Sequence, residues 1–160
     1  MAITADDYKN VMRCWATGVT IVTTPGPDGP HGMTANSFTG VSLDPPLILV
    51  CVSHQTRTHE HLQESGVFGV HLLHAGQEEL SNRCAGLLGE NGNEIDDLPH
   101  TTGPFDVPLL NDCLAALVCR VQAAYDGGDH TIFLGAVHAA RLSEGAPLLY
   151  FNRGYHRIKI

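Results

Sequence analysis

The run MTANSFTGVS, residues 33–42, holds the densest group of hydrogen-bonding side chains in the sequence. Five hydroxyl or amide side chains fall within nine residues of this run, and candidate strands flank it. Such a stretch offers many donors and acceptors to a flat, polar heterocycle. The same composition is typical of an ordinary turn rich in Asn and Ser, and composition alone favours the turn.

A second group has the sequence SHQTRT at residues 53–58, between an apolar run and a candidate helix. A helix N-terminus carries unpaired N–H groups and the positive end of the helix dipole, so it can bind a phosphate. The hydroxyl and guanidinium groups that could add to such a site belong to Ser53, Thr56, Thr58, Arg57 and Arg83. Simple N-capping by Thr58 explains the pattern equally well.

A third candidate is His130, in the sequence Gly128-Asp129-His130 between two candidate strands. Its imidazole could donate a hydrogen bond to a carbonyl or a phosphate, or serve as an acid or base. A single histidine in this position is more often a turn residue with an Asp partner. The chain has ten histidines, but the two in His59-Glu60-His61 are too close for the HExxH zinc motif. We therefore expect no metal site.

Several familiar nucleotide and nucleophile motifs are missing. Gly26, Gly29 and Gly32 lack the GxGxxG spacing, and the sequence has neither GxxxxGK[ST] nor GxSxG. If the protein uses a nicotinamide, it does not bind it through a Rossmann fingerprint. The five cysteines form no CxxC pair and mostly lie in apolar runs, so we expect reduced, buried thiols and a cytoplasmic location.

Length and charge narrow the possible classes. The chain has 160 residues, so we assign residues 1–160 to a single domain. Its net charge of −8 argues against nucleic-acid binding, which needs a basic surface. The sequence lacks the apolar stretch of about 18 residues that a membrane span needs, and its start does not resemble a signal peptide. Charged residues are 16% of the chain, which is low and favours an oligomer.

The hydrophobic pattern predicts a mainly β fold with two or three helices, in which about seven strands form the main part and a few candidates are short. The candidate strands are 19–24, 31–35, 41–43, 47–53, 67–73, 114–125, 131–142, 147–151 and 155–160. The run 47–53 is continuously apolar, so we expect it to be buried on both faces. Because strands and helices do not alternate, the pattern favours an antiparallel barrel with peripheral helices.

Helix and loop signals complete the expected arrangement. A helix begins at a Thr4–Asp7 capping box and stops by Gly18. A second helix spans 58–65, capped by Thr58 and followed by Gly66, and a third spans 77–88. Residues 36–40 and 89–104 are predicted loops.

Seven motifs in a fixed order carry a family resemblance. They are WATGVTIVTT at 15–24, GMTANSFT at 32–39, VSLDPPL at 41–47, SGVF at 65–68, NRCAG at 82–86, GDHTIFLG at 128–135 and PLLYF at 147–151. Their order and content resemble the short-chain flavin reductases of two-component monooxygenase systems. The similarity covers about residues 8 to 158.

The resemblance implies a homodimeric, Greek-key split β-barrel that binds FMN or FAD. It implies that NADH or NADPH reduces this flavin by hydride transfer from the nicotinamide C4 to the flavin N5. The reduced flavin would then leave and supply a separate monooxygenase. No cluster of arginines marks a site for a 2′-phosphate, so we favour NADH.

The motifs also imply roles for individual residues. Those assigned to the flavin ring and ribityl chain are Thr34, Ala35, Asn36 and Ser37, and those assigned to the flavin phosphate are Ser53, Gln55, Thr56, Thr58 and Arg83. His130 would orient the nicotinamide, and Tyr155 would approach the same site. The family usually has an aromatic residue where this chain has Cys84, which would alter the contact with the flavin.

Three functions remain open at this point. The first is an NAD(P)H:flavin oxidoreductase that feeds a partner monooxygenase, which the GDH motif favours. The second is an electron-transfer protein that keeps FMN as a tight prosthetic group. The third is a non-catalytic, His-rich metal-binding or interaction module.

Overall fold

The structure, a computed structural model, describes residues 2–87 and 93–158. Its strands are β1 (Thr17–Gly18), β2 (Thr20–Thr24), β3 (His31–Ala35), β4 (Phe38–Leu43), β5 (Pro46–Ser53), β6 (Val67–Leu72), β7 (His100–Thr102), β8 (Pro108–Leu110), β9 (Ala115–Asp126), β10 (His130–Leu142), β11 (Leu148–Phe151) and β12 (Gly154–Arg157). The helices are α1 (Ala5–Met12), α2 (Arg57–Ser65) and α3 (Glu78–Asn82), and a π-helical segment, Arg83–Leu87, continues α3.

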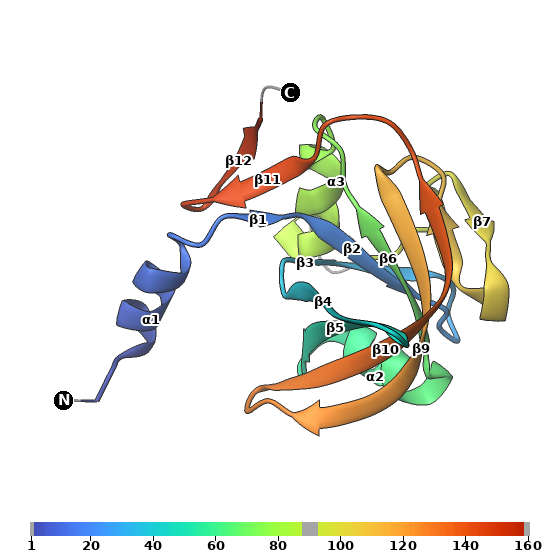
Figure 1. The fold of residues 1–160 in the computed structure, drawn as a ribbon, viewed down its shortest axis with the longest axis horizontal. Coiled ribbons are helices and arrows are strands. Elements are labelled where there is room, and N and C mark those ends of the chain that lie inside the picture. Colours follow the sequence, from blue (N-terminus) through green and yellow to red (C-terminus); the bar gives the residue numbers. More distant parts are fainter. Residues whose placement is uncertain (1, 88–92, 159–160) are drawn as a thin grey trace.

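A seven-stranded antiparallel sheet dominates the molecule (Figure 1). Its strand order is β3-β2-β6-β9-β10-β5-β4, and β11, β12 and β1 form a smaller sheet beside it. The predicted mainly β, antiparallel architecture with peripheral helices is confirmed. The two edge strands, β3 and β4, are consecutive in the chain, and only Asn36 and Ser37 separate them. Since three residue steps span at most about 11 Å, the sheet must curl until its edges meet at this joint.

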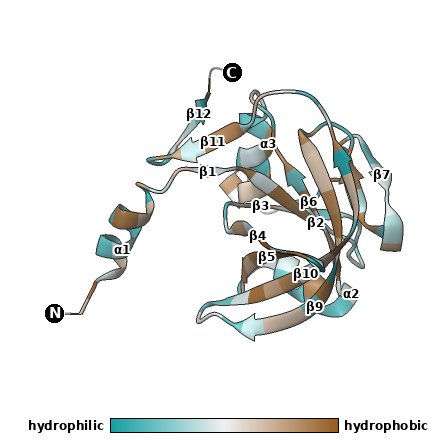
Figure 2. Ribbon diagram, viewed as in Figure 1, coloured by the Kyte–Doolittle hydropathy of each residue, from teal (hydrophilic) through white to brown (hydrophobic). Residues whose placement is uncertain are grey.

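The core fills the inside of the curled sheet. Its largest fully buried side chains include Phe68 and Phe133, and Gly135 lies against Phe68 so closely that a Cβ there would sit 2.5 Å from the ring. Figure 2 shows apolar residues concentrated on the central strands. All five cysteines are free thiols, and three of them are buried, namely Cys84, Cys113 and Cys119.

Two strand predictions were wrong. The loop predicted at 36–40 is limited to Asn36 and Ser37, because β4 begins at Phe38 and pairs with β5 from Phe38 opposite Val50. The strand 47–53 is not buried on both faces, because only alternate residues of β5 are buried. The alternate residues Leu47, Leu49 and Cys51 are only partly buried.

Three helix predictions and one loop prediction needed correction. The first helix ends at Met12 rather than near Gly18, which pairs within β1. Helix α2 is capped by Thr56, not Thr58, although Gly66 ends it in the left-handed conformation as predicted. The third helix widens after Asn82, and a short strand, β7, interrupts the predicted loop at 89–104. The first residues of that loop lie outside the described ranges.

Helix α1 lies apart from the sheet (Figure 1). The predicted capping box between Thr4 and Asp7 is confirmed. None of its residues is buried, and it exposes apolar side chains such as Val11, at 65% of its surface. One contact fixes its C-terminal end, where the backbone N–H of Asn152 donates to the carbonyl of Arg13 over 2.9 Å.

Candidate functional site

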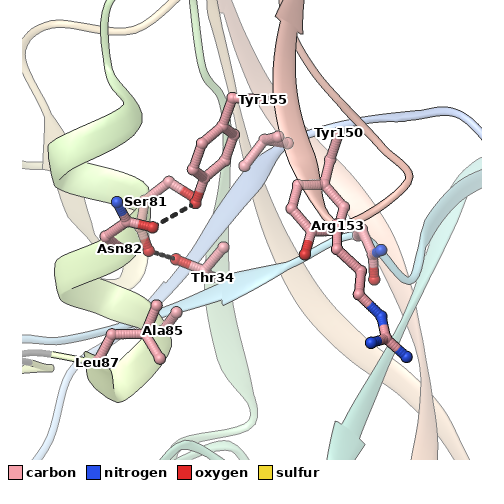
Figure 3. A pocket seen from close by; sticks show the side chains of 10 residues that line it. Thr34, Ser81, Asn82, Ala85, Leu87, Tyr150, Arg153 and Tyr155 are labelled. Atoms are coloured by element: carbon pink, nitrogen blue, oxygen red, sulfur yellow. Dashed lines mark hydrogen bonds between the residues drawn. The ribbon is translucent and has the colours of Figure 1, made fainter. Parts of the chain in front are cut away.

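Two cavities flank the joint between β3 and β4. The α2 cavity, of about 450 Å³, lies at the start of α2 and includes Gln55, Thr56 and Thr58 in its lining. The α3 cavity, of about 410 Å³, lies between α3 and the β11–β12 hairpin (Figure 3). Thr34 and Ala85 line both, so the two cavities adjoin.

The wall of the α2 cavity contains a buried hydroxyl group without a partner. Thr56 caps α2, because its Oγ1 accepts from the N–H of His59 at 3.3 Å while donating to the carbonyl of Ser53 at 2.9 Å. Thr58, two residues on, is fully buried, and its Oγ1 makes no hydrogen bond. A buried hydroxyl without a partner is costly unless a ligand satisfies it. With the unpaired N–H groups of the helix start, this wall is suited to an anion.

Arg57 supplies the guanidinium group of the α2 cavity. Two carboxylates also contact this group. It lies 3.4 Å from Asp28 and 3.6 Å from Glu94, and all three side chains are substantially exposed. Arg83, the predicted phosphate ligand, instead contacts Asp97 at 2.5 and 2.9 Å and the carbonyl of Glu94 at 2.7 Å. Its hydrogen bonds lower the pKa of the Asp97 carboxyl.

The floor of the α2 cavity is neutral. Cys84 is fully buried, and burial raises the pKa of its thiol to about 11, so it stays protonated. His31 is also buried, in edge-to-face contact with His61 at 5.2 Å between ring centroids. Burial, aided by the charges of His61 and Arg57, lowers the pKa of His31 to about 4, so its ring is neutral at pH 7.

Two of residues 34–37 line cavities, and the other two support the backbone of the joint. Thr34 and Asn36 line cavities, and the Thr34 hydroxyl donates to the carbonyl of Ser81 at 2.6 Å. Ala35 is buried, and its carbonyl accepts from Thr20. The Ser37 hydroxyl donates to the carbonyl of Cys51 at 2.9 Å and accepts from its N–H at 3.2 Å. Ser37 therefore fixes the joint to β5.

The α3 cavity is organised by a tyrosine. The Tyr155 hydroxyl lies 2.9 Å from Ser81 Oγ and 2.8 Å from Asn82 Oδ1, which ties β12 to α3 (Figure 3). Tyr150 packs edge-to-face on Tyr155, with 5.5 Å between ring centroids. Arg153 lies across the cavity from Ser81 and Asn82 (Figure 3).

His130 lies at the tip of the β9–β10 hairpin, opposite Ser53 of β5. Its Nδ1 is 2.6 Å from Asp129 Oδ1, and this hydrogen bond lowers the pKa of the Asp129 carboxyl. The carbonyl of Asp129 accepts from the N–H of His54, which joins the hairpin tip to the segment before α2. Ser53 Oγ accepts from the N–H of Gln55 at 3.4 Å.

Comparison with known families now decides the identity of the fold. The model of the flavin reductase like domain matches residues 12–159. The chain belongs to the flavin reductase family. The resemblance carried by the sequence motifs is therefore confirmed.

Solved structures and curated proteins agree with this assignment. This flavin reductase superposes on flavin reductase PheA2 with a TM-score of 0.90 and 35% identity, over 99% of this chain and 100% of that one. It is 40% identical to FMN reductase (NADH) SmoA of Agrobacterium fabrum, over 94% of this chain and 84% of SmoA. It is 38% identical to the reductase component of 4-hydroxyphenylacetate 3-monooxygenase of Thermus thermophilus, over 94% of this chain and 95% of the relative.

Within this flavin reductase the predicted residues separate into groups. Those that line the two adjoining cavities are Thr34, Asn36, Gln55, Thr56, Thr58, Cys84 and Tyr155. Ala35 and Ser37 support the joint, Arg83 contacts Asp97, and Ser53 and His130 lie together at the hairpin tip. These placements leave the assigned roles as predictions.

Four cavity residues could hardly be predicted from the sequence. Ser81 and Arg153 were not identified as site residues, and Asn82 and Tyr150 were noticed only within motifs. Ser81 and Asn82 join the site through Tyr155, which lies more than 70 residues further along the chain. Within the described ranges, His, Cys, Asp and Glu side chains nowhere form a group of three that could bind a metal ion. Among residues 2–87 and 93–158, no helix has the length and apolar character to cross a bilayer.

Proposed function

We propose that this protein is an NADH-dependent flavin reductase that reduces FMN or FAD and supplies the reduced flavin to a separate monooxygenase. The observation that carries the proposal is the pair of adjoining cavities at the β3–β4 joint, one of which has an anion-binding wall. Relatives named FMN reductase (NADH) and monooxygenase reductase component support the donor and the partner.

The donors in the α2 cavity suit the phosphate of a flavin nucleotide. The unpartnered Thr58 Oγ1 and the N–H groups at the start of α2 would bind its oxygens, and Gln55 would add an amide. We assign the guanidinium contact to Arg57 rather than Arg83, because Arg57 lines this cavity. Thr34 and Asn36 would lie beside the ribityl chain and the ring, where the cavities adjoin.

When bound, flavin supplies the hydride acceptor for the nicotinamide. The task of the protein is then to position two flat rings and exclude water, which is catalysis by orientation. Ser37 keeps the joint rigid through its two bonds to Cys51. Tyr155, fixed by Ser81 and Asn82, would limit how far a ring can move in the α3 cavity.

His130 would orient the nicotinamide or its phosphate without acting as an obligatory base. Its bond to Asp129 fixes one ring nitrogen and leaves Nε2 for a ligand. We expect His130→Ala to raise the KM for NADH about tenfold, the loss of one hydrogen bond. Flavin affinity, measured by fluorescence quenching, should hardly change. An equal loss of flavin affinity would contradict this role.

We also propose that the protein is a cytoplasmic homodimer. Apolar side chains in α1 and just after it, among them Tyr8, Val11 and Trp15, are more than half exposed. A second copy of the chain could cover them. Sedimentation of the purified protein would test the dimer.

Steady-state NADH oxidation, with and without added flavin, tests the proposed reaction. Saturable dependence on added FMN or FAD is the expected result for a diffusible reductase. A fast rate without added flavin would indicate a tight prosthetic group instead. No turnover by the folded protein with either nicotinamide would refute the proposal.

A further inference from the structure

We propose that the segment of residues 54–59 positions His130 by holding both of its neighbours in the chain, Asp129 and Thr131. The histidines of this segment are then positioning residues, because they act on a nicotinamide only through His130. The inference rests on the proposed function, in which His130 orients the nicotinamide, and it adds the part of the chain that keeps His130 in place.

Two histidine rings hold Thr131. Its Oγ1 lies 2.8 Å from Nε2 of His59 and 3.1 Å from Nε2 of His54. A hydroxyl group has one hydrogen, so it can donate to only one of the two nitrogens, and the other nitrogen must donate to its oxygen. Two hydrogen bonds therefore converge on one atom, and together they fix the position of the Thr131 side chain.

His59 is in turn fixed by α2 and by the core. The residue is 8% exposed, and its backbone N–H donates to Oγ1 of Thr56, the cap of α2, at 3.3 Å. Its ring packs edge-to-face on the buried Phe133, with 5.7 Å between ring centroids. The Thr131 hydroxyl is therefore bonded to a side chain that has little freedom to move.

Asp129, the other neighbour of His130, is held through its backbone. Its carbonyl accepts from the N–H of His54 at 3.1 Å. His54 thus contacts both neighbours of His130, one through its backbone and one through its ring. Since this segment also contains Thr56 and Thr58, the tip of the hairpin is bonded to the part of the chain that forms the anion-binding wall of the α2 cavity.

The tip of the β9–β10 hairpin depends on such anchors, because it projects from the sheet (Figure 1). Among the described residues, those of β9 after Val121 pair with β10 alone. Successive side chains of a strand point to opposite faces of the sheet. Holding Thr131 toward His59 and Phe133 therefore also turns His130 to the opposite face before any ligand binds. A side chain that is ordered in advance loses less entropy on binding.

A cycle of variants tests whether Thr131 acts through His130. Thr131→Val keeps the shape of the side chain and removes the oxygen that both rings contact. We expect it to raise the KM for NADH, with saturating FMN, about four- to tenfold and to change kcat little. In the His130→Ala background, the same change should alter this KM by less than about twofold, because the residue that it positions is absent.

Flavin affinity and a conservative variant sharpen the test. Thr131→Val should bind FMN as the wild-type protein does, because neither Thr131 nor His59 lines the α2 or α3 cavity. Thr131→Ser restores the hydroxyl and should restore the KM for NADH. A Thr131→Ser protein with the raised KM of Thr131→Val, or a matching loss of FMN affinity in Thr131→Val, would overturn the proposal.

Thr23→Val is the matched control. The Thr23 hydroxyl is buried and donates to the carbonyl of Pro108 at 2.6 Å, so its loss also removes a hydrogen bond. Thr23 lies on β2, which β6 and β9 separate from β10. Thr23→Val should lower the melting temperature but leave the KM for NADH unchanged. A rise in KM equal to that of Thr131→Val would mean that lost stability alone explains the effect, against the proposal.

The imidazole ring of His130 gives a readout that does not need turnover. Its order parameter, measured by NMR relaxation, should fall in Thr131→Val and stay high in the wild-type and Thr23→Val proteins. An unchanged order parameter, or an equal effect of Thr131→Val on KM with and without His130, would overturn the proposal. A wild-type protein that oxidises no NADH with flavin would instead refute the proposed function, and the order parameter then decides the anchoring by itself.

Should Thr131→Val unfold, His54→Ala replaces it. His54 is exposed, and this change removes one of the two ring contacts while the backbone bond to Asp129 remains. We expect the KM for NADH to rise about two- to threefold in the wild-type background and to stay unchanged in the His130→Ala background. A rise in both backgrounds would count against the proposal.

Discussion

The α2 and α3 cavities adjoin, but they are built differently. In the α2 cavity, the guanidinium of Arg57 is shared with Asp28 and Glu94, and a buried, neutral hydroxyl completes the wall. In the α3 cavity, the rings of Tyr150 and Tyr155 pack edge-to-face. The first cavity offers charge and directed hydrogen bonds, and the second offers aromatic rings. Added salt should therefore weaken binding at the α2 cavity more than at the α3 cavity.

The largest effect should come from removing the buried hydroxyl of the α2 cavity. Thr58→Val keeps the shape of the side chain and deletes a buried hydroxyl that makes no hydrogen bond in the free protein. A hydrogen bond to a charged group is worth about 1.5–3 kcal/mol, so flavin should bind about 10- to 100-fold more weakly. Fluorescence quenching of FMN measures this change.

The stability of the same variant provides the control. Because Oγ1 of Thr58 has no partner, Thr58→Val should not lower the free energy of unfolding. Thr56→Val should lower it by about 1 kcal/mol, because Thr56 caps α2. A Thr58→Val protein that is destabilised but binds flavin normally would show that the hydroxyl serves the fold.

Lowering the pH should affect the α2 cavity through His31, a buried residue in its lining. His31 has a pKa of about 4 in the folded protein, against about 6.5 when unfolded. Between these pH values the unfolded chain binds more protons than the folded protein does. The contribution of His31 to the free energy of unfolding is therefore fully present above about pH 6.5 and decreases as the pH falls toward 4. At about pH 5.5 the free energy of unfolding should be lower by roughly 1 kcal/mol.

Thermal melts across this pH range measure the effect. His71 is also buried, with a pKa lowered to about 4 by burial, so it adds to the slope. The variant His31→Asn should flatten the profile partly, and the remaining slope should be that of His71. A profile unchanged by His31→Asn would rule out the buried neutral state of His31.

The smallest effect concerns the competition for Arg57. Asp28→Asn and Glu94→Gln each remove a carboxylate from this guanidinium without changing the size of the side chain. Exposed ion pairs are worth about 0.2–1 kcal/mol, so each change should tighten FMN binding by about 1.5- to 5-fold. Asp106→Asn, a change in an exposed carboxylate outside the α2 cavity, is the control. Weaker binding in both variants would mean that the carboxylates position Arg57.

Local signals in the sequence were sufficient for most elements but not for the site. The capping box of α1, the β-branched run of β2 and Gly66 after α2 depend on neighbouring residues alone, so they could be predicted. The contact between Arg83 and Asp97 could not, because the two side chains meet only after folding. The Tyr155–Ser81 contact likewise forms only when distant segments meet.

The two-residue joint between β3 and β4 also bears on the order of folding. These strands are neighbours in sequence, yet they do not pair with each other and lie at opposite edges of the sheet. The joint closes only after the five strands between them have assembled through non-local contacts, which is a slow route for a small domain. Binding of flavin should therefore appear late in refolding, after most strand structure has formed, and a truncated chain that lacks β9 and β10 should have no site.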